Sequence, residues 1–109
     1  MARTDALQGS LDLLVLKILA RRGPLHGYGI TLQIETMSGD VLRVEEGSLY
    51  PALHRMEEAG WIKAEWAETD TKRRARMYKL TPAGHRQLEA EEARWSAVTS
   101  AVTHVLRMA

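Results

Sequence analysis

The stretch GSLYPALHRMEEAGWIKAEW, residues 47–66, changes its apolar period at Gly60. Before this glycine, Leu49, Leu53 and Met56 recur at the spacing of one helix face, which predicts a helix from about residue 47 to residue 59. After it, apolar and polar residues alternate as they do in a half-buried β-strand. Gly60 itself suits the C′ position at which a helix ends. The sequence therefore predicts a helix that leads directly into a strand.

A β-hairpin with a basic tip is predicted after this helix. Residues 61–66 and 75–80 alternate, and the residues that connect them are polar. The whole chain of 109 residues has 15 Lys and Arg against 14 Asp and Glu, yet residues 61–80 carry six basic and only three acidic side chains. The cations that follow one another without an intervening acid are Lys72, Arg73, Arg74, Arg76 and Lys79. Such a run is either a solvated loop or a hairpin that contacts phosphates.

The remaining elements are helices. Together with the helix over 47–59, they are predicted to span about residues 11–22, 27–38 and 82–106. Ser10 and Thr81 are candidate N-caps, and Pro82 suits the first helical position. The first helix is apolar on more than one side, so we expect it to be buried on more than one face. Three helices, a hairpin and a terminal helix are the order of a winged helix-turn-helix domain, mainly α in the α+β class.

The helix over 47–59 presents small and hydrogen-bonding side chains opposite its apolar face. They are Ser48, Tyr50, Pro51, His54 and Arg55. Such residues can enter a major groove, where Arg and His contact guanine edges and hydroxyl groups hold phosphates. The alternative is an ordinary solvated face that also carries Glu57 and Glu58. The helix before it and the basic hairpin after it favour the first interpretation, a recognition helix.

Three segments in combination resemble the PadR family of transcriptional regulators. They are LDLLVLKILARRGPLHGYGI at 11–30, EEGSLYPALHRMEEAGWI at 45–62 and RRARMYKLTPAG at 73–84. The resemblance covers residues 7 to 90, and the single terminal helix is similar to the shorter PadR subgroup. It implies a homodimeric repressor whose recognition helices enter adjacent major grooves of double-stranded DNA and whose wings reach the flanking backbone or minor groove.

The resemblance also implies which residues contact DNA. It places Ser48, Tyr50 and Arg55 in the recognition helix, Tyr28 at the start of the second helix, and Arg73, Arg74 and Arg76 in the wing. For Tyr28 the alternative is a packing residue with a satisfied hydroxyl.

The terminal helix carries a heptad stripe that predicts a dimer. Leu88, Trp95 and Val102 recur at seven residues, and Val98 and Val105 extend an a/d seam over the distal half. Glu91 interrupts the seam, so we expect the tightest contact from Trp95 onward. The alternative is that the stripe folds back on its own domain. We predict a DNA-binding domain over residues 1–82, a dimerisation helix over residues 83–109, and an inverted-repeat operator.

No motif in the chain indicates an enzyme, a cofactor or a metal. The histidines at 26, 54, 85 and 104 lack ligand spacing, and the absence of cysteine excludes disulfides and Cys-bound zinc. Uncharged stretches are shorter than the ~20 residues that a bilayer requires, and no secretory signal is visible. We therefore expect a cytoplasmic protein that has no membrane partner and catalyses no reaction.

Two further expectations concern ligands and partners. PadR-like regulators are released from DNA by small aromatic compounds, which implies an effector that stacks on Trp95, although a Trp on such a helix is more often an interface anchor. The residues alone also leave a second function open, a winged-helix module that binds an acidic partner protein. Only DNA binding predicts a steep dependence of duplex affinity on salt.

Overall fold

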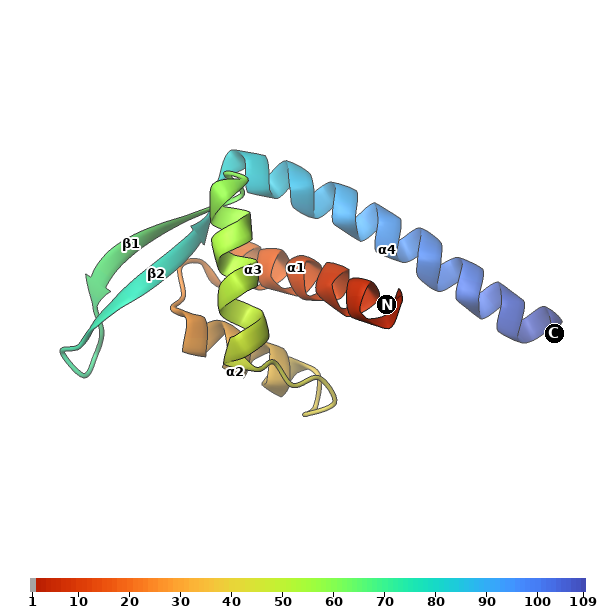
Figure 1. Ribbon diagram of the computed structural model, residues 1–109, viewed down its shortest axis with the longest axis horizontal. Helices are drawn as coiled ribbons and strands as arrows, with labels where there is room; N and C mark the ends of the chain where they lie inside the picture. Colours follow the sequence, from red (N-terminus) through yellow and green to blue (C-terminus); the bar gives the residue numbers. More distant parts are fainter. Residues whose placement is uncertain (1) are drawn as a thin grey trace.

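In the computed structural model, the backbone is described for residues 2–109 and the side chains for residues 10–109. The elements follow the order helix, helix, helix, strand, strand, helix (Figure 1). Their bounds are α1 Ala2–Arg22, α2 Gly27–Met37, α3 Glu46–Glu58, β1 Ile62–Glu68, β2 Arg74–Leu80 and α4 Pro82–Met108. This order confirms the predicted winged helix-turn-helix with a C-terminal helix, and its small antiparallel sheet confirms the mainly α, α+β class.

The first helix, α1, forms the centre of the fold and packs against α2, α3, α4 and β2. Val15 and Leu16 are fully buried and Leu13 is partly buried, which confirms burial on more than one face. The predicted start after Ser10 is wrong, because the helix begins at Ala2. Ala, Arg, Leu and Gln among the preceding residues favour a helix, so the backbone stays helical despite the ~1 kcal/mol that one glycine costs.

The helix-turn-helix consists of α2 and α3. As predicted, α3 buries Leu49, Leu53 and Met56. The chain leaves α3 through Gly60, whose φ of 80° lies in the left-handed region that favours glycine. Met37 is the last residue of α2 and is exposed outside the core.

The two strands pair as an antiparallel hairpin, which we call the wing. Trp66 of β1 lies opposite Arg76 of β2. The wing is joined to the helical core by Leu25, which exchanges backbone hydrogen bonds of 3.1 and 2.8 Å with Tyr78. Both strands extend nearer to the tip than the alternation predicted, because backbone pairing does not require alternating side chains.

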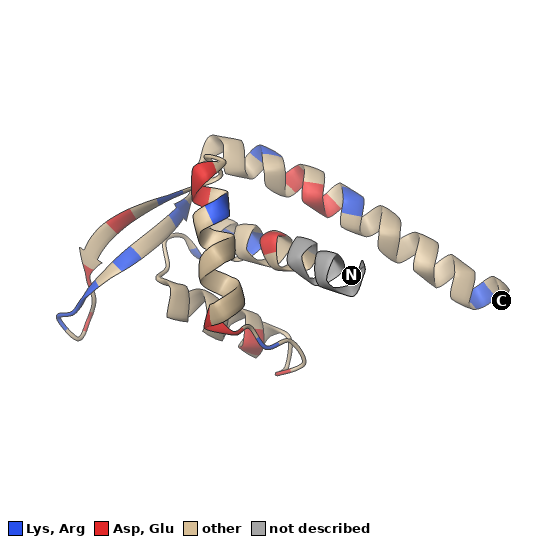
Figure 2. Cartoon of the chain, viewed as in Figure 1, with Lys and Arg blue, Asp and Glu red and all other residues tan. Residues whose placement is uncertain are grey.

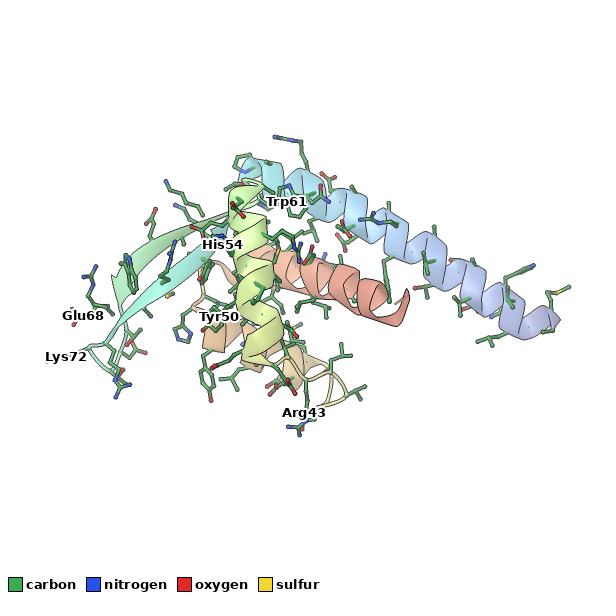
Figure 3. The ribbon with its side chains drawn as sticks, viewed as in Figure 1. Arg43, Tyr50, His54, Trp61, Glu68 and Lys72 are labelled. Carbon is green, nitrogen blue, oxygen red and sulfur yellow. The ribbon has the colours of Figure 1, made fainter. Side chains whose placement is uncertain are left out.

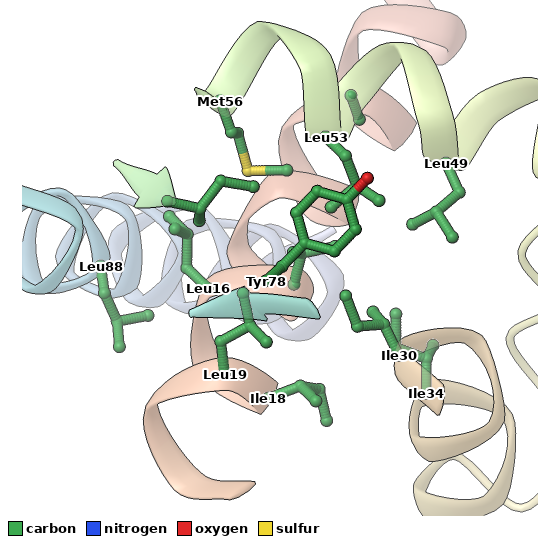
Figure 4. Close-up of a cluster of buried hydrophobic side chains, with 13 residues drawn as sticks. Leu16, Ile18, Leu19, Ile30, Ile34, Leu49, Leu53, Met56, Tyr78 and Leu88 are labelled. Atoms are coloured by element: carbon green, nitrogen blue, oxygen red, sulfur yellow. The ribbon is translucent and has the colours of Figure 1, made fainter. Parts of the chain in front are cut away.

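The hydrophobic core gathers residues from every element (Figure 4). Its buried members are Val15, Leu16, Ile18, Leu19, Ile30, Ile34, Leu49, Ala52, Leu53, Met56, Ile62, Tyr78 and Leu88. The assignment of Leu88 to a dimer interface is wrong, because this residue is only 5% exposed inside its own domain. The first turns of α4 cover α1, so the beginning of the heptad stripe belongs to the monomer.

The last helix, α4, starts at the wing and extends away from the domain (Figure 1). Thr81 Oγ1 accepts a hydrogen bond from the N–H of Gly84 at 3.0 Å, which confirms Thr81 as the N-cap. The molecule measures 55 × 29 × 26 Å and has a radius of gyration of 15.1 Å. A compact domain of 100 residues has a radius of only ~13 Å. The excess reflects the distal half of α4, which lies outside the core.

Candidate nucleic-acid interface

The His-Gly-Tyr segment at the start of α2 brings two helices together. His26 is the N-cap, and its Nδ1 accepts a hydrogen bond from the N–H of Gly29 at 2.9 Å. At Gly27 a Cβ would lie 2.6 Å from the hydroxyl oxygen of Tyr50, so only glycine lets this side chain of α3 pack here. Tyr28 is 65% exposed, and its ring lies beside that of His26 with centroids 6.4 Å apart. Tyr28 in this segment and Tyr50 of α3 are thus both exposed on either side of Gly27.

The exposed face of α3 carries most of the side chains predicted for a recognition helix. Ser48, Tyr50, Pro51 and His54 all lie at the surface. Tyr50 and His54 project from neighbouring turns of the helix (Figure 3). His54 Nε2 lies 3.5 Å from Glu58 Oε1, a contact between two exposed side chains. All four side chains are exposed, and Tyr50 also packs against Gly27 of α2.

Arg55 has a partner that the sequence analysis did not anticipate. Its Nη1 and Nη2 donate to Asp12 of α1 at 2.7 and 3.1 Å, and Asp12 is 8% exposed. This hydrogen-bonded pair raises the pKa of Arg55 against the opposing effect of partial burial. Nη1 and Nη2 each use one hydrogen in this pair, so they are less available to a guanine than those of an unpaired arginine. The pair ties α3 to α1.

Arg55→Ala is expected to lower the free energy of unfolding by about 1–3 kcal/mol, because it leaves the carboxylate of Asp12 buried without its bidentate partner. The partial exposure of Arg55 places the effect below that of a fully buried pair. Chemical denaturation measures the loss. The double variant Asp12→Ala/Arg55→Ala should be less destabilised than the sum of the single variants. If Arg55→Ala instead keeps its stability and loses discrimination between DNA sequences, the prediction that Arg55 contacts a base would be supported.

The tip of the wing is a tight turn that carries basic residues, coloured blue in Figure 2. The N–H of Thr69 donates to the carbonyl of Arg73 at 2.7 Å, and Lys72 adopts a φ of 61°. Within residues 10–109, neither Arg73 nor Arg74 forms an ion pair, so both charges are available to a ligand. Arg76 differs, because its Nη2 donates to Glu57 at 2.7 Å.

A groove of about 760 Å³ lies between the wing and the starts of α2 and α3. It is lined by His26, Gly27, Tyr28, Tyr50, Trp66, Thr69, Asp70, Thr71, Arg73, Arg74, Ala75, Arg76 and Tyr78. Burial raises the pKa of Tyr78, with Arg76 acting in the opposite direction, so its hydroxyl is protonated at neutral pH. The groove combines hydroxyl, aromatic and cationic groups, which are the groups that proteins use on the DNA backbone.

Half of the predicted DNA-contacting residues meet in this groove. Those inside it are Tyr28, Tyr50, Arg73, Arg74 and Arg76, and those outside it are Ser48, Pro51, His54, Arg55 and Lys72. Sequence reasoning missed His26, whose position directly before a helix start was the available signal. It also missed Trp66, whose place opposite the basic strand became visible only with the register of the hairpin.

The distal half of α4 carries an exposed apolar stripe. Trp95, Val98, Val102 and Val105 are 48–62% exposed. No charged residue occurs between Arg94 and Arg107, and Figure 2 shows this uncharged length of helix.

A second groove, of about 690 Å³, separates α4 from α1 and includes Trp95, Leu13 and Leu14. Beside this groove, Nζ of Lys17 in α1 and Oε2 of Glu92 in α4 form an ion pair of 3.0 Å. This groove and the exposed stripe are continuous at Trp95.

Two other kinds of site were searched over the described residues. None of the helices there combines the length and the apolar character needed to cross a membrane. No three His, Asp or Glu side chains in that part of the chain gather as metal ligands would.

The helix-turn-helix, the open face of α3 and the basic wing define a winged-helix DNA-binding regulator. Residues 15–90 match the Transcriptional regulator PadR-like family, and the chain belongs to this family. Among solved structures, a transcriptional regulator from Clostridium thermocellum is 27% identical, with a TM-score of 0.82 over 92% of this chain and 96% of that chain. The family and this neighbour are transcriptional regulators rather than enzymes.

Two curated relatives match over part of their length. The Negative transcriptional regulator PadR of Bacillus subtilis (strain 168) is 31% identical over 70 residues, 64% of this chain and 38% of that protein. An uncharacterised 37.1 kDa protein in a transposon of Streptomyces fradiae is 46% identical over 80 residues, 73% of this chain and 21% of that protein. The matched region thus spans less than two thirds of either relative.

Proposed function

We propose that this regulator is a homodimeric repressor that binds an inverted-repeat operator. The observation that carries the proposal is the convergence of Tyr28, Tyr50, Arg73 and Arg74 on one groove beside the open face of α3. Neither arginine forms an ion pair with the side chains described for residues 10–109. In this arrangement the face of α3 enters the major groove and reads bases, and the wing binds phosphates. Repression follows when the occupied site overlaps a promoter.

The dimer is proposed from the apolar stripe on α4. The same helix face that buries Leu88 in the core continues as Trp95, Val98 and Val102, which are 48–52% exposed. An uncharged stripe on a helix that extends beyond its own core is stabilised by a second copy of that stripe. We therefore propose that residues 1–82 form the DNA-binding unit and that residues 83–109 form the dimerisation helix.

Two-fold pairing sets the geometry of the operator. Recognition helices that bind neighbouring major grooves on one side of the duplex lie one helical turn apart, ~34 Å. Selection of bound sequences from a pool of random duplexes is the test. We expect the selected sequences to contain an inverted repeat with half-sites one turn apart. Selected sequences without two-fold symmetry would remove the operator proposal, and absence of any duplex binding would favour a module that binds an acidic protein.

The double variant Arg73→Ala/Arg74→Ala is expected to weaken binding to all duplexes while sequence preference stays. Each lost phosphate contact should reduce the slope of log K against log salt by about 0.9. Titrations of a random-sequence duplex at several salt concentrations measure the slope. Arg107→Ala is the control, because it removes one cation from the last turn of α4, at the end far from the wing. An unchanged slope in the double variant would show that the wing does not contact phosphates.

We also propose that the groove between α1 and α4 takes a small aromatic effector. Trp95 offers a half-exposed ring, and Leu13 and Leu14 supply an apolar wall. Quenching of tryptophan fluorescence by planar aromatic compounds tests this proposal. The quenching should be lost in Trp95→Leu, provided that sedimentation shows the variant still forms a dimer. Equal quenching in that variant would exclude Trp95 as the stacking ring.

A further inference from the structure

Trp66 is a large aromatic side chain that lies on the wing rather than in the core. It belongs to β1 and is 60% exposed. In the ladder it lies opposite Arg76, and Arg74 follows two residues away on the same face of the sheet. A side chain so exposed adds little to the hydrophobic core, so its contacts on the wing indicate its role.

The ring of Trp66 contacts two guanidinium groups of β2. The Cζ atom of Arg74 lies 5.4 Å from the ring centroid, and the Cζ atom of Arg76 lies 5.9 Å from it. Both distances fall within the ~6 Å range of cation–π attraction. The ring therefore restricts two cations on one face of the wing.

The two arginines differ in their other contacts. Arg76 donates to Glu57 of α3 at 2.7 Å, so its charge joins the wing to the recognition helix. Arg74 forms no ion pair within residues 10–109, although Glu68 lies opposite it in the ladder. A guanidinium that stacks on an aromatic face keeps the N–H donors at its edge free. Arg74 is thus restricted in position while its donors stay available.

We propose that Trp66 is a positioning residue that holds Arg74 ready to bind a DNA phosphate. Arg76 contacts the same ring and pairs with Glu57, so it links Trp66 to α3. The proposal rests on the DNA-binding function proposed above. An arginine that is already restricted loses less rotamer entropy when a phosphate fixes it, so the same ionic contact gives a higher affinity.

A double-mutant cycle on DNA affinity tests the proposal. Trp66→Leu, Arg74→Ala and the double variant are titrated by fluorescence anisotropy against a labelled random-sequence duplex at low salt. We expect Trp66→Leu alone to raise the Kd about 2- to 5-fold, the range that corresponds to an exposed cation–π contact. In the Arg74→Ala background the same change should leave the Kd unaltered, because the cation that the ring positions is gone.

The matched control combines Trp66→Leu with Lys72→Ala. Lys72 is a wing cation without an aromatic contact in the described part of the chain, so the two losses should multiply. Trp66→Phe keeps a smaller aromatic face and should give an intermediate Kd, and circular dichroism checks that each variant is folded.

Three results would overturn the proposal. An unchanged Kd in Trp66→Leu would show that the ring does not assist binding. Equal weakening by Trp66→Leu with and without Arg74 would show that Trp66 supports the wing in general. If the unaltered protein does not bind duplex at low salt, the proposed function fails, and this proposal fails with it.

Discussion

Val98→Glu is expected to convert the proposed dimer into a monomer at micromolar concentration. Val98 lies in the middle of the exposed stripe on α4, where two copies of the helix would meet. The substitution places an unpaired carboxylate from each copy in an apolar contact, and burial of such a charge costs several kcal/mol. A cost of about 3 kcal/mol already raises the dimer Kd more than 100-fold. Sedimentation velocity measures the change in mass.

The same variant should lose affinity for a palindromic operator, because a monomer contacts one half-site. Ala97→Glu is the matched control, since it adds the same charge to an exposed position on α4 that points away from the stripe. The control should remain a dimer and bind DNA with unchanged affinity. A Val98→Glu protein that stays dimeric would show that the stripe is not the interface.

Gly84→Ala is expected to lower the free energy of unfolding by about 3 kcal/mol, at the upper end of overpacking effects. A Cβ on Gly84 would lie 2.0 Å from the carbonyl oxygen of Trp61 and 2.6 Å from Cδ1 of Leu80. The backbone at Trp61 cannot move freely, because its carbonyl accepts a hydrogen bond from the N–H of Thr81 at 3.0 Å. For a domain of this size the loss corresponds to a Tm lower by roughly 10–20 °C.

The control for Gly84→Ala is Gly47→Ala. Gly47 lies in the first turn of α3, and a Cβ built there would extend into open space. Alanine at this position should leave the Tm unchanged or raise it slightly, because alanine favours a helix by about 1 kcal/mol over glycine. Equal melting temperatures for the two variants would show that the backbone at the junction between the wing and α4 can shift to accommodate a Cβ at little cost in stability.

The sequence by itself determined the elements whose signals are local. The helical spacing of Leu49, Leu53 and Met56, the cap at Thr81 and the glycine at position 60 each depend on residues within about one turn. The basic hairpin followed from alternation on either side of a polar segment. Hydrogen bonds of helices and hairpins join residues close in the chain, so their sequence signals do not depend on the rest of the fold.

The tertiary structure alone decided which polar and apolar groups are free. Arginine is a residue type that reads bases, but the side chain of Arg55 pairs with Asp12, 43 positions away in the chain. Leu88 continues a heptad stripe, but it is buried in its own domain because the first turns of α4 cover α1. Arg76 pairs with Glu57 of α3, and Trp66 meets the wing arginines across the sheet. Each outcome depends on where distant elements pack, and side-chain partners brought together by packing carry no signal in their local sequence.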